Sequence, residues 1–167
     1  MKKSLYILFF ALMPLLAAGS LADGTRAGDE ELILGNWKPS NGRSVVKVYR
    51  GAGGDEDANK FYGKIVWLKE TKDADGNPRT DINNPEDDLK SKPLKGLVII
   101  KDLEFVEVDG KVVTWGGDGT IYDPNNGSEY SFEANIDKKN KNVMNGRGYI
   151  GVSLFGRTDT WSRLVKK

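Results

Sequence analysis

Apolar and polar positions alternate in short runs from Leu32 to the end of the chain. Stretches rich in Val, Ile, Thr, Tyr, Phe and Trp are separated by clusters of Gly, Asn, Asp and Pro, which is typical of strands joined by turns. We expect strands within 32–38, 44–50, 60–69, 96–101, 104–108, 111–115, 120–122, 129–136 and from 142 onward. One helical turn is expected at 85–89, with Asn84 as its cap. The pattern predicts an all-β domain.

Glycine interrupts the last apolar segment, Asn145–Leu164, at positions 146, 148, 151 and 156. In a strand, glycine marks a bulge, a bend or a close backbone approach. Several of them in neighbouring strands favour a sheet that curls to meet itself. We therefore expect a small closed antiparallel up-and-down β-barrel of about eight strands, in which the last segment pairs with the first. A two-layer sandwich is the alternative.

The first 22 residues have the layout of a secretory signal peptide. A basic start, Met1–Lys3, precedes an apolar run at 5–18 and a small-x-Ala cleavage site that ends at Ala22. The run is shorter than the roughly 20 apolar residues that span a bilayer. We expect a signal peptide at 1–22, a flexible leader at 23–31 and a single β-barrel domain at 32–167. The cleaved protein would be periplasmic or secreted and would keep no stable membrane span.

Composition narrows the classes of function. Removing 22 of the 167 residues leaves 145, a normal size for one domain. Both lysines of that segment leave with it, so 23 of the 25 Lys and Arg remain against 24 acids, a net charge of −1. This balance argues against a nucleic-acid partner, which needs a concentrated basic surface. The chain has no Cys and no His, so disulfides, thiol chemistry and a Ser-His-Asp triad are excluded and we expect no cofactor.

Trp37 and Arg163 stand near the two ends of the predicted barrel sequence. Gly35-Asn36-Trp37 in the first strand and Arg163 in the last resemble the arrangement in lipocalin-like barrels. There a tryptophan plugs one end and a C-terminal arginine lies across its ring, because a guanidinium stacks on an indole while its donors reach backbone carbonyls. The resemblance implies a structural role in barrel closure. An ordinary core tryptophan is the alternative.

Aromatic side chains are spread over the predicted strands, with two arginines nearby. Pointing inward, they would line a barrel suited to a small amphiphilic ligand. The alternative is that they fill the interior, since an eight-stranded barrel is just small enough for side chains to close it. The candidate lining residues are Tyr49, Tyr62, Trp67, Trp115, Tyr122, Tyr130, Tyr149, Trp161, Arg147 and Arg157.

The acidic connection at 70–92 offers oxygen ligands at alternate positions. Asp73, Asp75, Asn77 and Asp81 are weak calcium candidates, because the EF-hand template is not met: glycine comes fourth instead of sixth, and no Glu stands at the twelfth place. A solvated acidic loop is favoured, and no metal site is expected. The length of the connection itself is typical of functional loops.

Carboxylates are the acid–base groups that remain for an enzyme. Glu104, Glu107, Glu129 and Glu133 lie on predicted strands, where a hydrolase would need two of them facing across a cleft. Surface charge is the favoured interpretation, and we do not expect an enzyme.

Several stretches, taken in order, resemble a secreted bacterial family catalogued as domain of unknown function 2147. They are Gly35–Lys38, Phe61–Ile65, Asp81–Pro85, Pro93–Leu97, Ile121–Pro124 with Gly127 and Tyr130, Arg147–Gly151 and Leu154–Arg163. The resemblance covers nearly the whole chain after residue 22, and the closing segment is its most specific part. It implies an envelope protein with a calycin-like β-barrel, and it implies no activity.

The leading hypothesis is an exported lipocalin-like barrel that binds a small amphiphilic molecule or an envelope protein. The alternative is a solid-cored structural or interaction protein of the cell envelope. A carboxylate-dependent hydrolase is a distant third.

Overall fold

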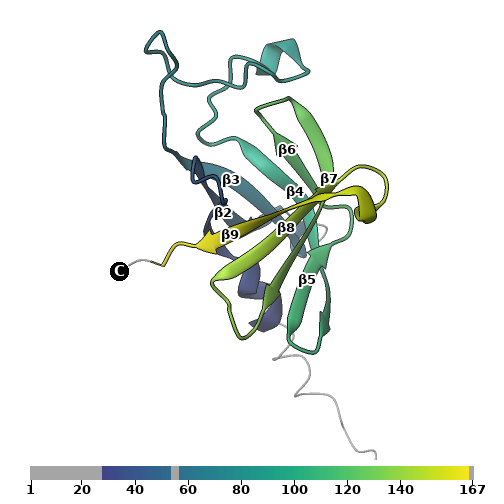
Figure 1. The fold of residues 1–167 in the computed structure, drawn as a ribbon. Helices are drawn as coiled ribbons and strands as arrows, with labels where there is room; N and C mark the ends of the chain where they lie inside the picture. Colours follow the sequence, from purple (N-terminus) through teal and green to yellow (C-terminus); the bar gives the residue numbers. More distant parts are fainter. Residues whose placement is uncertain (1–27, 54–56, 166–167) are drawn as a thin grey trace, which may run out of the picture.

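The computed structural model describes residues 28–53 and 57–165. Within them, nine strands form one antiparallel sheet that closes on itself (Figure 1). The strands are β1 (Gly35–Lys38), β2 (Ser44–Arg50), β3 (Lys60–Leu68), β4 (Val98–Asp109), β5 (Val112–Gly116), β6 (Thr120–Asp123), β7 (Ser128–Asp137), β8 (Val143–Tyr149) and β9 (Arg157–Arg163). Three 3₁₀ turns accompany them: η1 (Glu31–Ile33), η2 (Asp87–Leu89) and η3 (Ser153–Phe155). The predicted signal peptide, 1–22, lies outside the described residues.

The strands follow one another around a ring with eight positions. β1 pairs with β2 on one side and with β9 on the other, and β3 pairs with β4. β4 pairs with both β5 and β6, and so does β7, because β5 and β6 run in line and share one position. The described residues therefore confirm the predicted closed antiparallel barrel of about eight strands.

β4 joins two segments that the sequence pattern separates. The strands expected at 96–101 and 104–108 form one strand because Asp102 takes a left-handed backbone conformation, φ 52°, within the run. The register between β3 and β4 shifts at this point, as expected for a β-bulge. Aspartate tolerates this conformation better than most residues. The carboxylate of Asp102 then faces outward and pairs with Lys60, N–O 3.1 Å.

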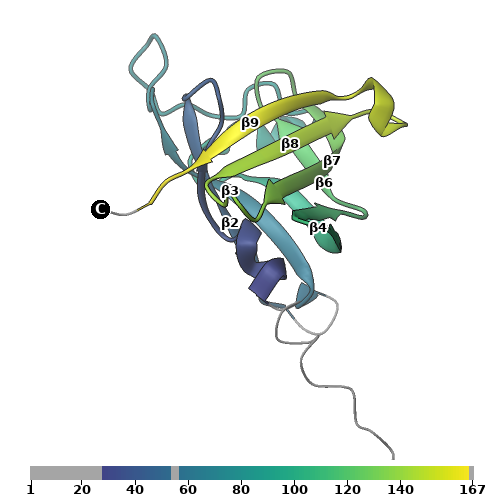
Figure 2. The ribbon, with the colours of Figure 1, turned by 60° about the horizontal axis from the view of Figure 1, so that its bottom comes forward.

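The two ends of the barrel differ. One end, here called the loop end, carries the β1–β2 turn, the β3–β4 connection (69–97), the β6–β7 turn and the β8–β9 connection (150–156). The opposite end, the floor, carries the β4–β5 and β7–β8 turns and a helical segment at 28–33. Figures 1 and 2 show this helical segment at the floor and the β8–β9 connection projecting away from it.

The helical segment belongs to the folded unit. Residues 28–31, which the sequence pattern assigns to a flexible leader, are helical and lie against the floor. Trp115 Nε1 donates to the carbonyl of Glu30 at 3.2 Å, and Lys138 Nζ pairs with Asp29 Oδ2 at 2.6 Å. Ile33 is fully buried in the core. These partners place the start of the domain ahead of the predicted boundary at Leu32.

Trp37 and Arg163 meet at the floor. They face each other across the β1–β9 pair, and the guanidinium lies 4.1 Å from the centre of the indole ring. Trp37 is fully buried, and its Nε1 donates to the carbonyl of Ile33 at 2.8 Å. Arg163 donates to the carbonyls of Leu34 (2.6 Å), Lys141 (2.9 Å) and Leu32. Burial lowers the pKa of Arg163. One planar fork thus supplies donors to three backbone carbonyls while it covers the indole.

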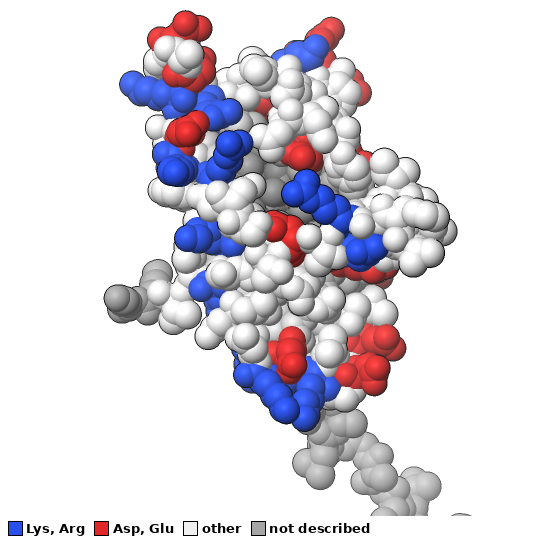
Figure 3. All heavy atoms as spheres, in the orientation of Figure 1, with Lys and Arg blue, Asp and Glu red and all other residues white. Residues whose placement is uncertain are grey.

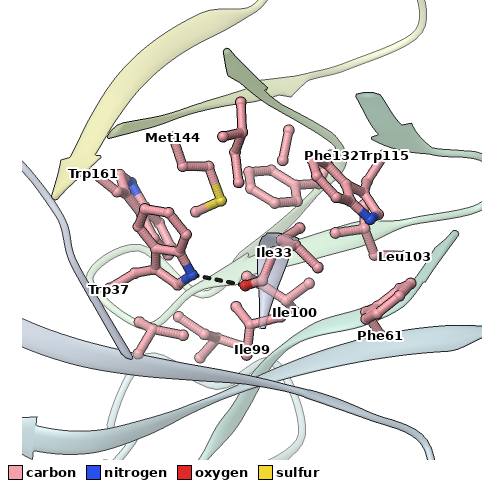
Figure 4. Close-up of a cluster of buried hydrophobic side chains, with 14 of the residues drawn as sticks. Ile33, Trp37, Phe61, Ile99, Ile100, Leu103, Trp115, Phe132, Met144 and Trp161 are labelled. Carbon is pink, nitrogen blue, oxygen red and sulfur yellow. Dashed lines mark hydrogen bonds between the residues drawn. The ribbon is translucent and has the colours of Figure 1, made fainter. Parts of the chain in front are cut away.

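Side chains fill the interior of the barrel. Apolar side chains from every strand position meet in one cluster (Figure 4). Two inward-facing glycines show how tight the packing is. A Cβ at Gly146 would lie 2.9 Å from the Phe132 ring, and one at Gly63 would lie 2.8 Å from Ile100. The buried members of the cluster are Ile33, Trp37, Val46, Val48, Phe61, Ile65, Ile99, Ile100, Leu103, Val113, Trp115, Tyr122, Phe132, Ala134, Ile136, Met144 and Trp161.

Enlarging a small interior side chain tests this packing. Ala134 is 1% exposed and faces Trp115 and Gly146 on the neighbouring strands. We expect Ala134→Leu to lower the free energy of unfolding by about 1–3 kcal/mol, because a filled core has no room for added carbons. Ser131→Leu, on the outer face of the same strand, should change it by less than about 0.5 kcal/mol. Urea denaturation measures both, and a stable Ala134→Leu variant would indicate a hollow barrel.

Removing the guanidinium at the floor should destabilise the barrel. Arg163→Met leaves the carbonyls of Leu32 and Leu34 without their charged donor, so we expect a loss of about 2–4 kcal/mol in unfolding free energy. Arg157→Met, at the exposed start of the same strand, is the matched control and should cost less than about 0.5 kcal/mol. Equal stabilities of the two variants in denaturant titrations would contradict the closure role.

Candidate functional site

The candidate lining residues do not share one surface. Trp115, Tyr122 and Trp161 point into the barrel and are buried in its core. Tyr130 is half-buried at the loop end, where its hydroxyl accepts from Asn126 Nδ2 at 3.0 Å. Arg157 is exposed at the same end. The inward aromatic side chains are part of the packed interior.

Other candidates lie on the outer face. Burial alternates along β3, with Phe61, Gly63 and Ile65 inward, so Tyr62 faces outward and its ring centre lies 6.1 Å from that of Tyr49. Burial and hydrogen bonds from its hydroxyl to two carboxylates, Asp57 and Asp102, raise the pKa of Tyr62.

Trp67 and Tyr149 also lie outside. Trp67 is 46% exposed and borders an open depression of about 400 Å³ between β1, β3 and the chain beyond β9. Such an open surface buries little of a ligand. The hydroxyl of Tyr149 donates to Glu133 at 3.1 Å, and burial, followed by this bond, raises the pKa of Tyr149.

Arg147 holds the β8–β9 connection. Its Nε donates to the carbonyl of Ser153 at 2.7 Å, and its terminal nitrogens reach the Leu154 carbonyl (3.2 Å) and Thr158 Oγ1 (2.9 Å). Its donors are therefore used within the protein. A bound anion would have to displace these contacts.

The acidic candidates serve local contacts. The carboxylate of Asp73 accepts the backbone N–H groups of Asp75 and Asn77, at 3.0 and 2.8 Å, and so caps a turn. Asp81 is fully buried elsewhere in the same connection. Among the described residues, no group of three or more His, Cys, Asp and Glu is arranged to hold a metal ion.

The four glutamates considered for hydrolysis lie on β4 and β7. Glu129 pairs with Lys101 at 3.1 Å and accepts from Thr120, while Glu133 accepts the hydroxyls of Tyr149 and Ser153. Glu104 and Glu107 lie on β4. None of the four lines the depression beside Trp67 or the small pocket at the loop end of the barrel.

A small pocket opens at the loop end of the barrel. Its volume is about 90 Å³, and it lies where the ends of β2 and β3 meet the β3–β4 connection and the β6–β7 turn. Its base is apolar, and its rim carries cations and amides. The lining residues are Asn41, Arg43, Ser44, Ile65, Leu68, Lys69, Glu70, Arg79, Leu94, Pro124 and Asn125.

Positive charge dominates this rim. Three cations, Arg43, Lys69 and Arg79, stand against one acid, Glu70, which pairs with Arg79 at 3.1 Å. The side chains of Arg43 and Lys69 make no hydrogen bond or ion pair with another described residue. In Figure 3, Lys and Arg side chains gather over the β3–β4 connection at the upper left. The rim of the pocket therefore carries a net positive charge.

The volume limits what the pocket can take. Pockets for drug-sized ligands measure about 300–1,000 Å³, and a cavity of about 150 Å³ holds benzene. At about 90 Å³ the pocket accommodates a carboxylate, a phosphate or a similar group with a few further atoms. A longer ligand would extend into solvent.

A buried polar contact holds the β3–β4 connection, which forms one wall of this pocket, against the barrel. Asp81, from the β3–β4 connection, accepts the hydroxyl of Tyr122 at 2.8 Å and Asn84 Nδ2 at 2.7 Å. Both carboxylate oxygens therefore have donors, which a buried carboxylate requires. Asn84 Oδ1 also accepts the backbone N–H of Glu86. The helical turn predicted at 85–89 is present as η2, but Glu86 is at its N-cap position and no side chain caps it, so the prediction of Asn84 as the cap is wrong. The long connection is thus attached to the barrel through its most buried acid.

A second contact continues this wall. Asn83 Nδ2 donates to the carbonyls of Pro124 and Asn125, both at 3.0 Å, and so joins the connection to the β6–β7 turn. The pocket is held by contacts between segments about 40 residues apart in sequence.

Arg43, Lys69 and Asn125 are absent from the residues that sequence reasoning selects. Their signal is weak, because a cation beside a turn is ordinary in a soluble protein. The one usable indication is that the turns after β1 and β3 must lie at the same end of an up-and-down barrel. The β6–β7 turn lies at this end too because β5 and β6 run in line and share one position.

No helix in the described residues is long and apolar enough to cross a membrane.

Replacing Tyr122 tests the attachment of the long connection. Burial, reinforced by the bond to Asp81, raises the pKa of Tyr122 to about 12. The ordinary pKa is about 10, so the neutral phenol stabilises the fold below about pH 10, and this contribution is lost as pH rises through about 12. Tyr122→Phe should cost about 1–3 kcal/mol near neutral pH, because Asp81 loses a donor.

The difference in unfolding free energy between wild type and Tyr122→Phe should become smaller as the pH rises from about 10 to about 12. Unfolding free energies from denaturant titrations at several pH values measure it. Tyr130→Phe, whose hydroxyl contacts an exposed amide, is the control and should cost less than about 1 kcal/mol. A pH-independent difference would argue against the buried contact.

Comparisons with known proteins agree with this architecture. A solved structure described as "Protein HP1028 from the human pathogen Helicobacter pylori belongs to the lipocalin family" is similar, with 22% sequence identity and a TM-score of 0.59. The match covers 80% of this chain and 83% of that one, and at this identity it shows the fold alone. No curated protein matches the chain. A family model described as "Uncharacterized protein conserved in bacteria (DUF2147)" matches residues 35–163, which include every strand of the barrel. The chain therefore belongs to this bacterial family, DUF2147, and has a lipocalin-like fold.

Proposed function

We propose that this protein is an exported binding protein that holds the acidic head group of a small amphiphile at the loop end of its barrel. The observation that carries the proposal is the pair of cations, Arg43 and Lys69, which lack partners among the described residues and border the pocket. The signal-peptide layout of residues 1–22 supports export to the periplasm or beyond.

Electrostatics favour an anionic ligand. Two cations without partners among the described residues, at a partly enclosed site, attract a negative group more strongly than the same charges in open water. Arginine also presents a planar fork that matches carboxylate and phosphate oxygens. The amide side chain of Asn41 adds a neutral donor at the rim, whereas Asn125 Nδ2 already donates to Asp123 at 2.7 Å.

The pocket base favours a ligand with an apolar part. Ile65, Leu68 and Leu94 form this base, and Ile65 is 3% exposed. The carbons next to the acidic group would contact them and leave water. The packed interior excludes the remaining carbons of the ligand from the barrel. An acyl tail would therefore lie along the outside of the loop end.

A solid-cored structural or interaction protein of the envelope is the second candidate. The filled interior favours it, because a lipocalin-like protein that carries a whole ligand needs an open cavity. In this case the protein would act through surface contacts with an envelope partner.

Titration with simple amphiphiles tests the proposal. We expect hexanoate and hexyl phosphate to raise the melting temperature in a concentration-dependent way, because a ligand that binds the folded state stabilises it. Hexyltrimethylammonium, with the same tail and the opposite charge, should leave it unchanged. Replacing Arg43 and Lys69 together by Gln should weaken binding by about tenfold or more.

A charge-matched control separates the pocket from net charge. Lys111→Gln with Lys139→Gln removes two exposed cations at the floor and should leave hexyl phosphate binding unchanged. Native mass spectrometry of protein from its own cells should then show a retained acidic molecule. Equal stabilisation by hexyltrimethylammonium would favour the structural alternative. So would the absence of stabilisation by all three amphiphiles, combined with a native mass equal to that of the protein alone.

A further inference from the structure

The β8–β9 connection is a protruding apolar tip. Four large apolar side chains within six residues are largely exposed: Ile150 (73%), Val152 (57%), Leu154 (82%) and Phe155 (80%). Such a concentration on the surface marks an interaction site. Figure 3 shows it as an uncharged projection at the right, with positively charged side chains beside it and acidic side chains below.

Hydrogen bonds within the tip and at its base hold its backbone with these side chains outward. Arg147 bonds to the carbonyls of Ser153 and Leu154, and the η3 turn adds bonds from Phe155 N to Val152 O (3.2 Å) and from Gly156 N to Ser153 O (3.1 Å). At the base, Ser153 Oγ donates to Glu133 at 3.1 Å. The exposure of the apolar side chains is therefore part of the folded structure.

We infer that this tip, Ile150–Phe155, inserts into the surface of a bilayer that contains anionic phospholipid. The tip projects beyond β8 and β9 (Figures 1 and 2), and no charged residue interrupts its sequence from 150 to 155. The carbonyls of Val152, Ser153 and Leu154 already have donors within the protein, so fewer backbone groups would lose water on insertion.

The charges beside the tip agree with this partner. Residues 148–158 contain no Asp or Glu, and Arg157 is exposed at the start of β9. The Glu133 carboxylate at the base of the tip accepts the hydroxyls of Ser153 and Tyr149. Apolar side chains combined with adjacent cations bind anionic interfaces. The tip lies at the same end of the barrel as the pocket, so insertion would turn the pocket towards the membrane. This inference does not depend on pocket binding.

Vesicle partitioning tests it. Protein from its own cells, with its N-terminus identified by mass spectrometry, is sedimented with phosphatidylcholine vesicles that lack or contain phosphatidylglycerol. Leu154→Ser with Phe155→Ser should lower partitioning to the anionic vesicles by about tenfold or more. The matched control, Val106→Ser with Val108→Ser, removes exposed apolar side chains near the floor and should partition like wild type.

The contribution of Arg157 and the insertion of the tip into the bilayer are measured separately. Arg157→Ser should weaken partitioning about fivefold for the anionic vesicles and leave that for phosphatidylcholine alone unchanged. Because the chain has no cysteine, Leu154→Cys takes a single environment-sensitive fluorophore, whose emission should shift to the blue with anionic vesicles. The same label at Lys111→Cys, near the floor, should not shift.

Equal partitioning of wild type and the Leu154→Ser/Phe155→Ser variant would overturn the inference. An emission spectrum of the label at 154 that does not change when anionic vesicles are added would also overturn it. If the double variant instead loses binding to a protein or to a second copy while vesicle binding is absent throughout, the tip is a protein interface and the membrane assignment is wrong.

Discussion

The width of an eight-stranded barrel is the constraint on which the rest of the structure depends. A ring of this size is just wide enough for side chains to meet at its centre. Three tryptophans and two phenylalanines are buried there, and glycines on β3 and β8 admit neighbouring side chains that a Cβ would block. The interior is therefore a hydrophobic core. We therefore expect contacts with another molecule on the surface, and our proposals place them at the loop end.

Two arginines, Arg163 and Arg147, donate to backbone carbonyls of irregular segments at opposite ends of the barrel. Irregular segments that leave a barrel carry backbone carbonyls that the sheet cannot pair. At the floor, Arg163 donates to carbonyls of the segment before β1 and of the β7–β8 turn. At the loop end, Arg147 does so for the β8–β9 connection. In both places a planar fork on a strand fixes a segment that has little regular structure of its own.

The sequence permits the ring and its closure to be predicted, because strand periodicity, turn residues and the glycines of the last segment all favour a closed sheet. Closure brings the first and last strands together, and this places Trp37 beside Arg163. The direction of individual side chains is harder to predict. A period of two separates the faces of a strand but resets at each bulge, as at Asp102 and between Val45 and Val46.

The candidate site was less accessible from sequence, since it is formed by contacts between distant segments. Asp81 resembles a solvated acid or a calcium ligand in the sequence, whereas in the structure it is buried against Tyr122. The apolar residues after Tyr149 favour a strand by composition, yet they form an exposed turn because β8 ends there and Arg147 holds the segment away from the sheet. Neither outcome follows from local propensity.

The most direct test is to locate a bound acidic amphiphile by NMR. Hexyl phosphate is titrated into isotope-labelled protein, with the backbone amides of Lys69 and Asn125 as reporters of the pocket and the Met144 methyl and Trp161 indole as reporters of the interior. Our account predicts saturable shifts at the two amides and unchanged signals at the two interior groups. Saturable shifts at Met144 and Trp161 would contradict it, because they would show a ligand entering a barrel that we describe as full.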